Sequence, residues 1–260
     1  MRINRIVRGR PQTMMSFNGR QGDSVKPASL VVNDPPMVRR VKDLEPVLYD
    51  ASSCRNPNQP VYTVYRTLWA DDDERSLLHK HHLRFDVTDM PPLMLGEEYA
   101  KTFGHEHLPW TEGWSPPELF EVLEGEACFL IQRHNGEKVA DVSLKTAREG
   151  DVVLAPPSCG HVMINASAKR LIVGNLISRY CLQTYQRFID QKGGAYFLLN
   201  GGRLVRNENY SSLPEVRIAN ARALDFDEKK FRLLASLAMR PELFRFLNAQ
   251  YDVPPCNRSE

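Results

Sequence analysis

The sequence lacks several features that would assign it to a class at once. No apolar run reaches the roughly 18 to 20 residues of a membrane-spanning helix, so we expect a soluble chain. The 34 basic and 32 acidic residues leave a net charge of +2, which predicts no nucleic-acid-binding face and no membrane patch. The five cysteines form no C-x-x-C pair, so neither a disulfide framework nor a cysteine zinc site is expected. A reducing compartment, the cytoplasm, is the simplest expectation.

The composition is that of a folded protein, with 42% hydrophobic and 25% charged residues over a chain of 260. We divide the chain into an N-terminal extension (1–58), a barrel domain (59–200) and a C-terminal extension (201–260). Residues 1–22 hold five arginines and no acidic residue. This predicts a disordered basic arm, with an organelle transit peptide as the alternative. The six prolines from Ser24 to Pro60 leave room only for short strands or one short helix.

Short apolar runs bounded by turn residues predict strands at 61–69, 83–90, 119–133, 139–144, 152–155, 162–165 and 171–178. Asn135-Gly136 between two of these runs indicates a hairpin. Many short strands without alternating helices favour an all-β barrel or sandwich. In residues 226–248 apolar side chains recur at helical spacing, and Pro241 is expected to open a second helix. We expect this apolar stripe to pack on the barrel or on a second subunit.

Three histidines and one glutamate form the pattern that carries chemistry. His105 and His107 lie two residues apart, so on a strand both side chains point to one face. Glu118 begins an apolar run whose alternate residues face the interior, and a carboxylate buried there needs a positive partner. His161 opens a later strand. Three imidazoles and one carboxylate suit a divalent transition metal and leave positions open for a ligand.

The remaining histidines are not assigned to the metal. His79, His81 and His82 follow a run of acidic residues, and we expect them in a solvated loop. His134 adjoins the Asn-Gly turn and is expected to be exposed.

The spacing of the metal motif resembles that of the cupins. Gly104-His105-x-His107 with Glu118 and Gly125 is similar to the first cupin signature, and Gly150-x5-Pro156-x4-His161-x3-Asn165 to the second. Within the cupins, the chain resembles the cupin-type glucose-6-phosphate isomerases. The segments that carry this likeness are 83–88, 96–105, 117–125 and 156–161, continuing to Tyr185 and Lys192-Gly193.

The resemblance implies a jelly-roll barrel, paired as a homodimer, that uses one divalent ion of iron, manganese, zinc or nickel. Its metal ligands would be His105, His107, Glu118 and His161. Its sugar-phosphate contacts would be Thr88, Thr102 and Gly104, with Tyr99 lining the pocket, Tyr185 reaching in, and Tyr62 or Tyr65 nearby. We add Lys101 because a phosphate needs positive charge, with a surface lysine as the alternative.

The implied activity is the interconversion of glucose 6-phosphate and fructose 6-phosphate, a step of glycolysis and gluconeogenesis. A divalent ion would act as a Lewis acid on the substrate carbonyl and its neighbouring hydroxyl. Glu118 is the only carboxylate expected at the ion and is our candidate for the base that moves the proton. A metal-assisted hydride shift is the alternative and needs no base.

The chain departs from the family pattern at several positions. Ile177 and Gln183 stand where the family often has a tyrosine and a histidine, and Asn175 is a candidate for a compensating polar contact. Trp110 and Trp114, in a long loop, are expected to pack on the barrel rather than cover the pocket. Two other functions stay open: another metal-dependent cupin enzyme (a dioxygenase or other sugar isomerase), and a non-catalytic sugar-phosphate-binding cupin.

Overall fold

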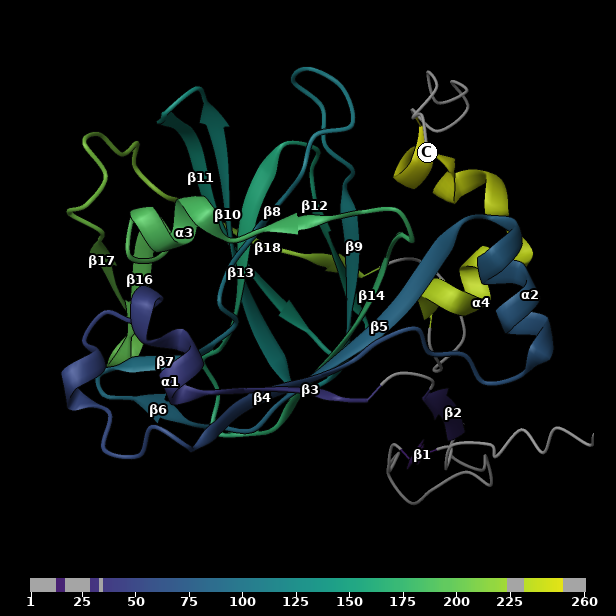
Figure 1. Cartoon of the computed structure of the whole chain (residues 1–260), viewed down its shortest axis with the longest axis horizontal. Helices are drawn as coiled ribbons and strands as arrows, with labels where there is room; N and C mark the ends of the chain where they lie inside the picture. The colour runs from purple at the N-terminus through teal and green to yellow at the C-terminus, as the bar shows by residue number, and fades with distance from the viewer. Residues whose placement is uncertain (1–12, 17–28, 33–34, 224–231, 250–260) are drawn as a thin grey trace, which may run out of the picture.

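The computed structural model describes residues 13–16, 29–32, 35–223 and 232–249, and two curved sheets dominate it (Figure 1). The seven-stranded sheet has the order β19 (Arg222–Ala223), β12 (Asp151–Ala155), β9 (Glu118–Glu124), β14 (Leu171–Ser178), β5 (Leu83–Met90), β4 (Pro60–Tyr65) and β3 (Met37–Arg40). The eight-stranded sheet has the order β17 (Arg203–Arg206), β16 (Tyr196–Leu199), β7 (Glu98–Lys101), β13 (Cys159–Asn165), β10 (Glu126–Asn135), β11 (Lys138–Arg148) and β18 (Arg217–Asn220), with β6 (Met94–Leu95) beside β7. This confirms the predicted all-β barrel.

Smaller elements complete the fold. Two short strand pairs join β1 (Thr13–Ser16) to β2 (Ser29–Val32) and β8 (Glu106–His107) to β15 (Gln183–Thr184). The α-helices are α1 (Val41–Leu44), α2 (Asp72–Lys80), α3 (Gln186–Asp190) and α4 (Arg232–Met239). The 3-10 helices are η1 (Glu45–Val47), η2 (Ala51–Ser53), η3 (Asn200–Gly202) and η4 (Pro241–Asn248). None of the described helices is both long and apolar enough to cross a membrane.

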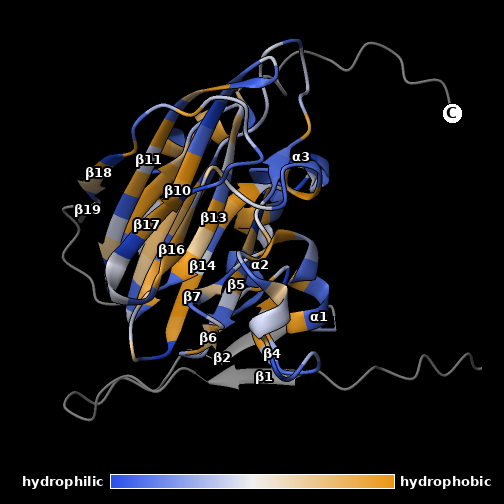
Figure 2. Cartoon of the chain, turned by 90° about the vertical axis from the view of Figure 1, so that its left-hand side faces the viewer, coloured by the Kyte–Doolittle hydropathy of each residue, from blue (hydrophilic) through white to orange (hydrophobic). Residues whose placement is uncertain are grey.

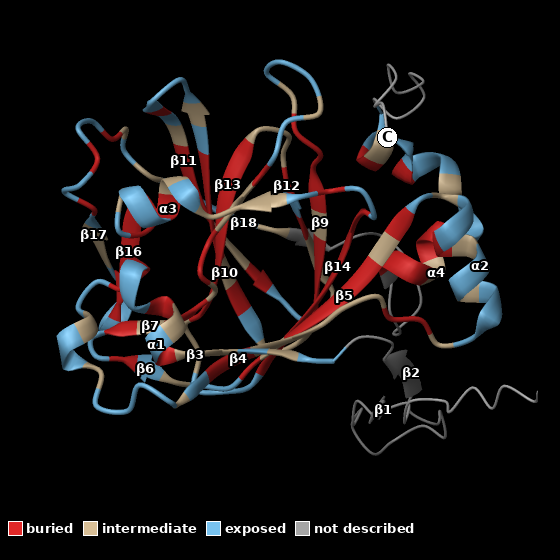
Figure 3. Ribbon diagram, viewed as in Figure 1, coloured by how far each residue is buried: buried red, intermediate tan, exposed pale blue. Residues whose placement is uncertain are grey.

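The main core lies between the inner faces of the two sheets. Phe120 and Val122 of the seven-stranded sheet share this core with Phe129 and Met163 of the other. Figure 2 shows apolar residues covering β13 and β14, whereas polar and apolar residues mix along β11. Every position of β14 is buried because this strand is covered on both faces (Figure 3).

A second core covers the outer face of the seven-stranded sheet. Phe85 of β5 and Leu176 of β14 belong to the same buried cluster as Leu237 of α4 and Leu247 of η4. The apolar stripe of the C-terminal region therefore packs on the barrel, as one of the two expectations had it. Pro241 opens the second, 3-10 helix as predicted, and residues 226–231 of the predicted helical stretch lie outside the described residues.

Two glycines explain how the strands are divided. The hairpin at Asn135-Gly136 is confirmed, because β10 and β11 pair on either side of it and Gly136 has a φ of 64°. The single run predicted at 119–133 is wrong, since Gly125 separates β9 from β10. Gly125 has a φ of 86°, and a Cβ there would lie 2.4 Å from the carbonyl oxygen of Arg170. Only glycine allows this close turn between two strands.

The loop predicted around His79 and His81 is wrong, because α2 lies there. The acidic run that suggested a solvated loop is the start of this helix: Asp71 accepts a hydrogen bond from the Glu74 amide at 2.8 Å. Leu78 anchors the helix in the second core, so His79 lies on a helix and His81 ends it.

His134 is also not the exposed residue that its turn position predicted. Its imidazole is only 6% exposed, with Nε2 2.9 Å from the Gln132 amide nitrogen and 3.4 Å from a Glu106 oxygen. Tyr210, from the C-terminal extension, lies near the ring and bonds Gln132. Burial lowers the pKa of His134 to about 4, and the charge of Arg187 adds to this effect.

The predicted segment boundaries at 58 and 200 stay predictions. Both sheets nevertheless take strands from the flanking segments: β3 comes from the N-terminal one, and β17, β18 and β19 come from the C-terminal one. Of the basic arm over residues 1–22, only residues 13–16 are described.

Candidate metal centre

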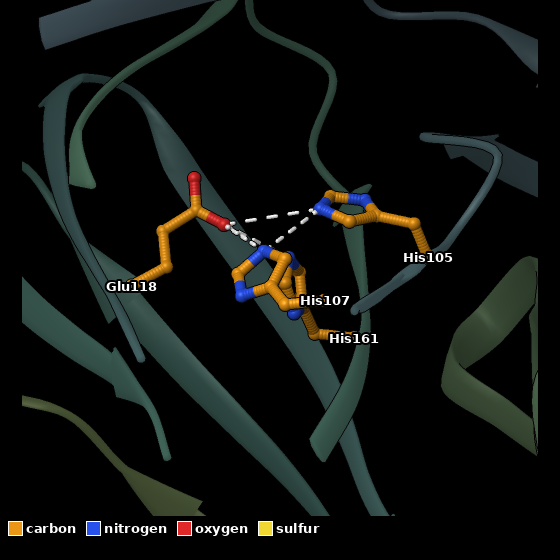
Figure 4. Close-up of side chains that lie close together, drawn as sticks. All are labelled: His105, His107, Glu118 and His161. Atoms are coloured by element: carbon orange, nitrogen blue, oxygen red, sulfur yellow. Dashed lines mark hydrogen bonds and ion pairs between the residues drawn. The ribbon is translucent and has the colours of Figure 1, made fainter. Parts of the chain in front are cut away.

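The four predicted ligands come from three parts of the barrel and meet in its interior (Figure 4). Glu118 is the first residue of β9 in the seven-stranded sheet, and His161 lies on β13 in the eight-stranded sheet. His105 forms an isolated bridge with His161, and His107 ends the short strand β8. The chain between β7 and β8 therefore carries two histidines into the space between the sheets.

The ligand atoms lie at distances that suit a shared ion. Nε2 of His107 and Nε2 of His161 each lie 3.2 Å from Glu118 Oε2. His105 Nε2 lies 3.2 Å from His107 Nε2 and 3.9 Å from Glu118 Oε2. Atoms that bind one ion at about 2.1 Å stand about 3.0 to 3.4 Å apart when they are neighbours in the coordination sphere. The three 3.2 Å pairs match this spacing, and all four ligand atoms lie within 4.8 Å of one another.

Buried atoms without hydrogen bonds support the same conclusion. Among the described residues, Glu118 Oε2 and His161 Nε2 are buried and form no aligned hydrogen bond. Leaving such groups unpartnered costs about 1 to 3 kcal/mol each. A cation among these atoms removes that cost, so the residues present fit a divalent metal. The side chain of His105 is 16% exposed and those of the other three are 3 to 4% exposed, so the cluster opens on the His105 side.

Two contacts orient the ligands. His107 Nδ1 lies 2.7 Å from the carbonyl oxygen of Pro116, so it donates there and leaves Nε2 directed at the cluster. The Asn175 amide donates to Glu118 Oε1 at 2.7 Å, which leaves Oε2 facing the three histidines. The observed contact of Asn175 is with the carboxylate of Glu118, and the compensating contact near the substrate stays a prediction.

The electrostatics of the cluster depend on its single carboxylate. Burial raises the pKa of Glu118, but the adjacent imidazoles of His107 and His161 outweigh burial and hold that pKa well below its ordinary value. Burial lowers the pKa of His107, but the contacts of its imidazole with Cys181 and with the Glu118 carboxylate raise that pKa to about 10. Burial and the two other imidazoles lower the pKa of His105 well below its ordinary value. Without a metal, the cluster therefore stores a proton at His107.

Two of the predicted phosphate contacts are not brought to the cluster. Lys101 lies opposite Ile164 on β13, and directly opposite residues share a face. His161 has the other parity on β13, so Lys101 and Tyr99 point away from it. The Lys101 ammonium is buried, 2.5 Å from a Glu98 carboxylate oxygen and 2.6 Å from the Val47 carbonyl oxygen. Lys101 is therefore neither the surface lysine nor a free charge for a phosphate.

Gly104 and Thr102 have structural partners of their own. A Cβ at Gly104, whose φ is 83°, would lie 2.6 Å from the Phe188 ring, so close packing explains the glycine. Thr102 Oγ1 accepts a hydrogen bond from the Met163 amide at 3.0 Å, which ties the His105 segment to β13.

Other predicted substrate contacts do lie on the inner side of the barrel. Thr88 is opposite Val173, which belongs to the main core together with Val122. The Tyr185 ring centre is 5.9 Å from that of His105. Of the two early tyrosines, Tyr62 is the one near this group, since its hydroxyl accepts a hydrogen bond from the Phe103 amide and Phe103 contacts Tyr185. Tyr65 packs against the second core instead.

Two of the residues at which the chain departs from the family pattern lie beside the cluster. Ile177, buried, lies opposite Glu118 and offers it no polar group. Gln183 lies opposite His107, and its Oε1 accepts hydrogen bonds from the Tyr185 hydroxyl at 3.1 Å and from Arg66 Nη2 at 3.3 Å. Sequence reasoning missed Arg66, and no motif marked it. The two loop tryptophans, Trp110 and Trp114, contact each other with ring centres 5.5 Å apart.

Comparison with known proteins identifies the family. The family model described as Glucose-6-phosphate isomerase (GPI) matches residues 38–215, more than half of the chain. The chain belongs to this family. The matched region of this glucose-6-phosphate isomerase family member begins in β3 and contains the whole metal cluster, whereas α4 and η4 lie beyond it. No curated protein matches the chain significantly.

Solved structures that match this family member include an oxalate decarboxylase and an oxalate oxidase. Oxalate decarboxylase of Bacillus subtilis, solved in work on its Mn(II) centres, is 16% identical over 48% of this chain and 28% of its own, with a TM-score of 0.35. A recombinant oxalate oxidase in complex with glycolate is 18% identical over 53% of this chain and 60% of its own, with a TM-score of 0.35. The chain thus spans little more than a quarter of the decarboxylase. These scores are too low to transfer an activity.

Proposed function

We propose that this protein is a metal-dependent isomerase that interconverts glucose 6-phosphate and fructose 6-phosphate. The observation that supports it is the four-ligand cluster inside the region that matches the family. A bound divalent ion supplies Lewis-acid polarisation of the substrate carbonyl. The partial exposure of His105 leaves one side of the cluster open for a sugar to approach.

The residues of the chain hold this centre in position. Asn175 and the Pro116 carbonyl orient Glu118 and His107, so the ligand atoms need little rearrangement when an ion binds. Thr88 lies on the inner face of β5 and is the proposed hydroxyl contact for the sugar. We further propose a homodimer, which light scattering of the purified protein tests.

Glu118 is the proposed base where the hydrogen moves as a proton, because it is the only carboxylate of the cluster. Asn175 donates to its Oε1 and its Oε2 faces the histidines of the cluster, so Glu118 has to release one of these contacts to take the proton. Reaction in D₂O tests this role. Deuterium in the product supports proton transfer through a base. Its complete absence over many turnovers favours a hydride shift, with Glu118 as a ligand alone.

The test of the function is an assay of fructose 6-phosphate conversion with the purified protein. Activity should disappear with a chelator and return with iron, manganese, zinc or nickel, each added alone. Glu118→Ala should lose both bound metal and turnover, whereas Glu124→Ala, at the other end of β9, should keep both. Oxygen consumption would instead indicate a dioxygenase. Binding of fructose 6-phosphate without turnover under any metal would indicate a non-catalytic cupin.

A further inference from the structure

Two arginines beside the metal cluster have no acidic partner. Arg39 lies on β3 and Arg66 directly follows β4, and these strands are neighbours in the sheet (Figure 1). Within the described residues, no carboxylate lies within ion-pair distance of either guanidinium, although other charged groups of the barrel interior are paired. Arg84 contacts Asp86 at 2.9 Å, and Lys101 contacts Glu98. Burial raises the pKa of Asp86, and Arg66 is near enough for its charge to oppose that rise. The Asp86 carboxylate is already paired with Arg84, however, so part of the charge of the two arginines stays available to a ligand.

Arg39 points into the barrel. It lies opposite Tyr62, whose hydroxyl is on the inner side, and its guanidinium carbon is 5.8 Å from the centre of the Tyr185 ring. Its Nε is buried and has no hydrogen-bond partner in the described part of the chain. A buried N–H of a guanidinium is costly to leave unpaired. An acceptor entering from the open side of the cluster would remove that cost.

Arg66 reaches the same place from the neighbouring strand. Its Nη2 donates to Gln183 Oε1, the oxygen that also accepts the Tyr185 hydroxyl. Tyr185 thus has Arg39 over its ring and Arg66 linked to its hydroxyl through Gln183. The same ring lies 5.9 Å from that of His105, the most exposed metal ligand. Both arginines are partly exposed, so a solute can reach them.

We infer that Arg39 and Arg66 bind the anionic group of the substrate, a phosphomonoester, while the sugar end occupies the metal cluster. Two guanidiniums offer paired N–H donors that match phosphate oxygens. Glu118 faces the histidines and Asp86 is paired with Arg84, so neither carboxylate neutralises both arginines, and a bound divalent ion would make this side of the cluster more positive. A dianionic ligand complements that charge. This inference rests on the proposed function and replaces Lys101 as the source of positive charge.

The test compares Arg39→Gln and Arg66→Gln with the wild-type protein, loaded with the same metal. The control is Arg203→Gln, which removes an equal charge from an exposed ion pair with Glu97. Each of these two substitutions, called the mouth variants below, should lower kcat/KM for fructose 6-phosphate about 10- to 100-fold, because it removes one charge-assisted hydrogen bond. Inhibition by inorganic phosphate should weaken in parallel, and the control should match the wild type.

Two measurements distinguish a structural role of Arg39 from a role in ligand binding: the melting temperature of Arg39→Gln and the activity of Arg39→Lys. Arg39→Lys keeps the positive charge but loses the paired N–H donors of the guanidinium. Its kcat/KM should therefore lie between those of the wild type and Arg39→Gln. Wild-type values in both mouth variants would overturn the inference while leaving the proposed isomerase intact. If the wild type does not isomerise, calorimetry with fructose 6-phosphate and with inorganic phosphate decides. Binding that is lost in both mouth variants supports the anion site, and binding that is absent or unchanged overturns it.

Discussion

Replacing Asn175 tests whether the metal centre depends on a residue that binds no metal. Its amide donates to Glu118 Oε1 at 2.7 Å, and both side chains are buried. Asn175→Ala removes this donor and leaves a buried carboxylate oxygen without a partner. A hydrogen bond to a charged group contributes about 1.5 to 3 kcal/mol. Since 1.4 kcal/mol is a factor of ten, metal affinity should fall about 10- to 100-fold.

The assay is titration of the metal-free protein with Mn²⁺ or Zn²⁺ in competition with a chelator of known affinity. Asn165→Ala is the matched control, because Asn165 is also a buried asparagine of the barrel interior. It bonds only backbone carbonyls of Met90 and Lys169 and the nearby Ser167. Both variants should be less stable to urea, and only Asn175→Ala should bind metal more weakly. Equal metal affinity in Asn175→Ala and the wild type would refute the idea that the amide orients Glu118.

Three further predictions follow from the backbone and the titrating groups. Gly104→Ala should cost about 2 to 5 kcal/mol in urea unfolding, because it adds a clash with Phe188 to the strain of a positive φ. Gly113 has a φ of 74° and open space around it, so Gly113→Ala should cost only about 1 to 2 kcal/mol of unfolding free energy. Equal losses of unfolding free energy in the two variants would refute the idea that Phe188 crowds position 104. Metal uptake should release the proton held at His107, whose pKa is about 10 in the metal-free cluster, so affinity should rise about tenfold per pH unit around neutrality. Calorimetry in buffers of different ionisation enthalpy measures that proton, and a release of zero would contradict it. For His134 the folded pKa of about 4 lies below the ordinary 6.5, so the unfolded chain takes up the proton first. Stability should therefore fall as pH drops from 6.5 toward 4, and His134→Gln should flatten this slope in urea titrations at several pH values.

The four residues of the candidate metal cluster could be predicted from the sequence because they lie in recognisable motifs. His105 and His107 are two residues apart, and parity alone puts them on one face. Glu118 is the first residue of β9 and His161 lies within β13, and the sequence marks both segments as apolar strands. The family resemblance set the spacing between these pieces. The same alternation predicted β4, β5 and β9 to β14, but it missed the glycine break between β9 and β10 and the short strands outside these runs, such as β3, β7 and β16.

The assignment of the substrate contacts was less successful because it needed the register between strands. Lys101 is four residues from His105, yet its pairing with Ile164 turns it to the opposite face. The acidic residue that neutralises it, Glu98, is close in sequence, but the burial of the pair depends on chain segments far away. His134 was misplaced for the same reason, since Tyr210 is distant in sequence.

The sequence by itself determined the fold class and the four residues of the candidate metal cluster, because strand periodicity indicates the first and the spacing of the family motifs the second. Only the tertiary structure decided what surrounds that centre. Asn175 and Glu118 are 57 positions apart, and Arg66 and Gln183 are 117 apart. Contacts over such separations depend on which strands become neighbours and in which register, and no local pattern of residues carries that information.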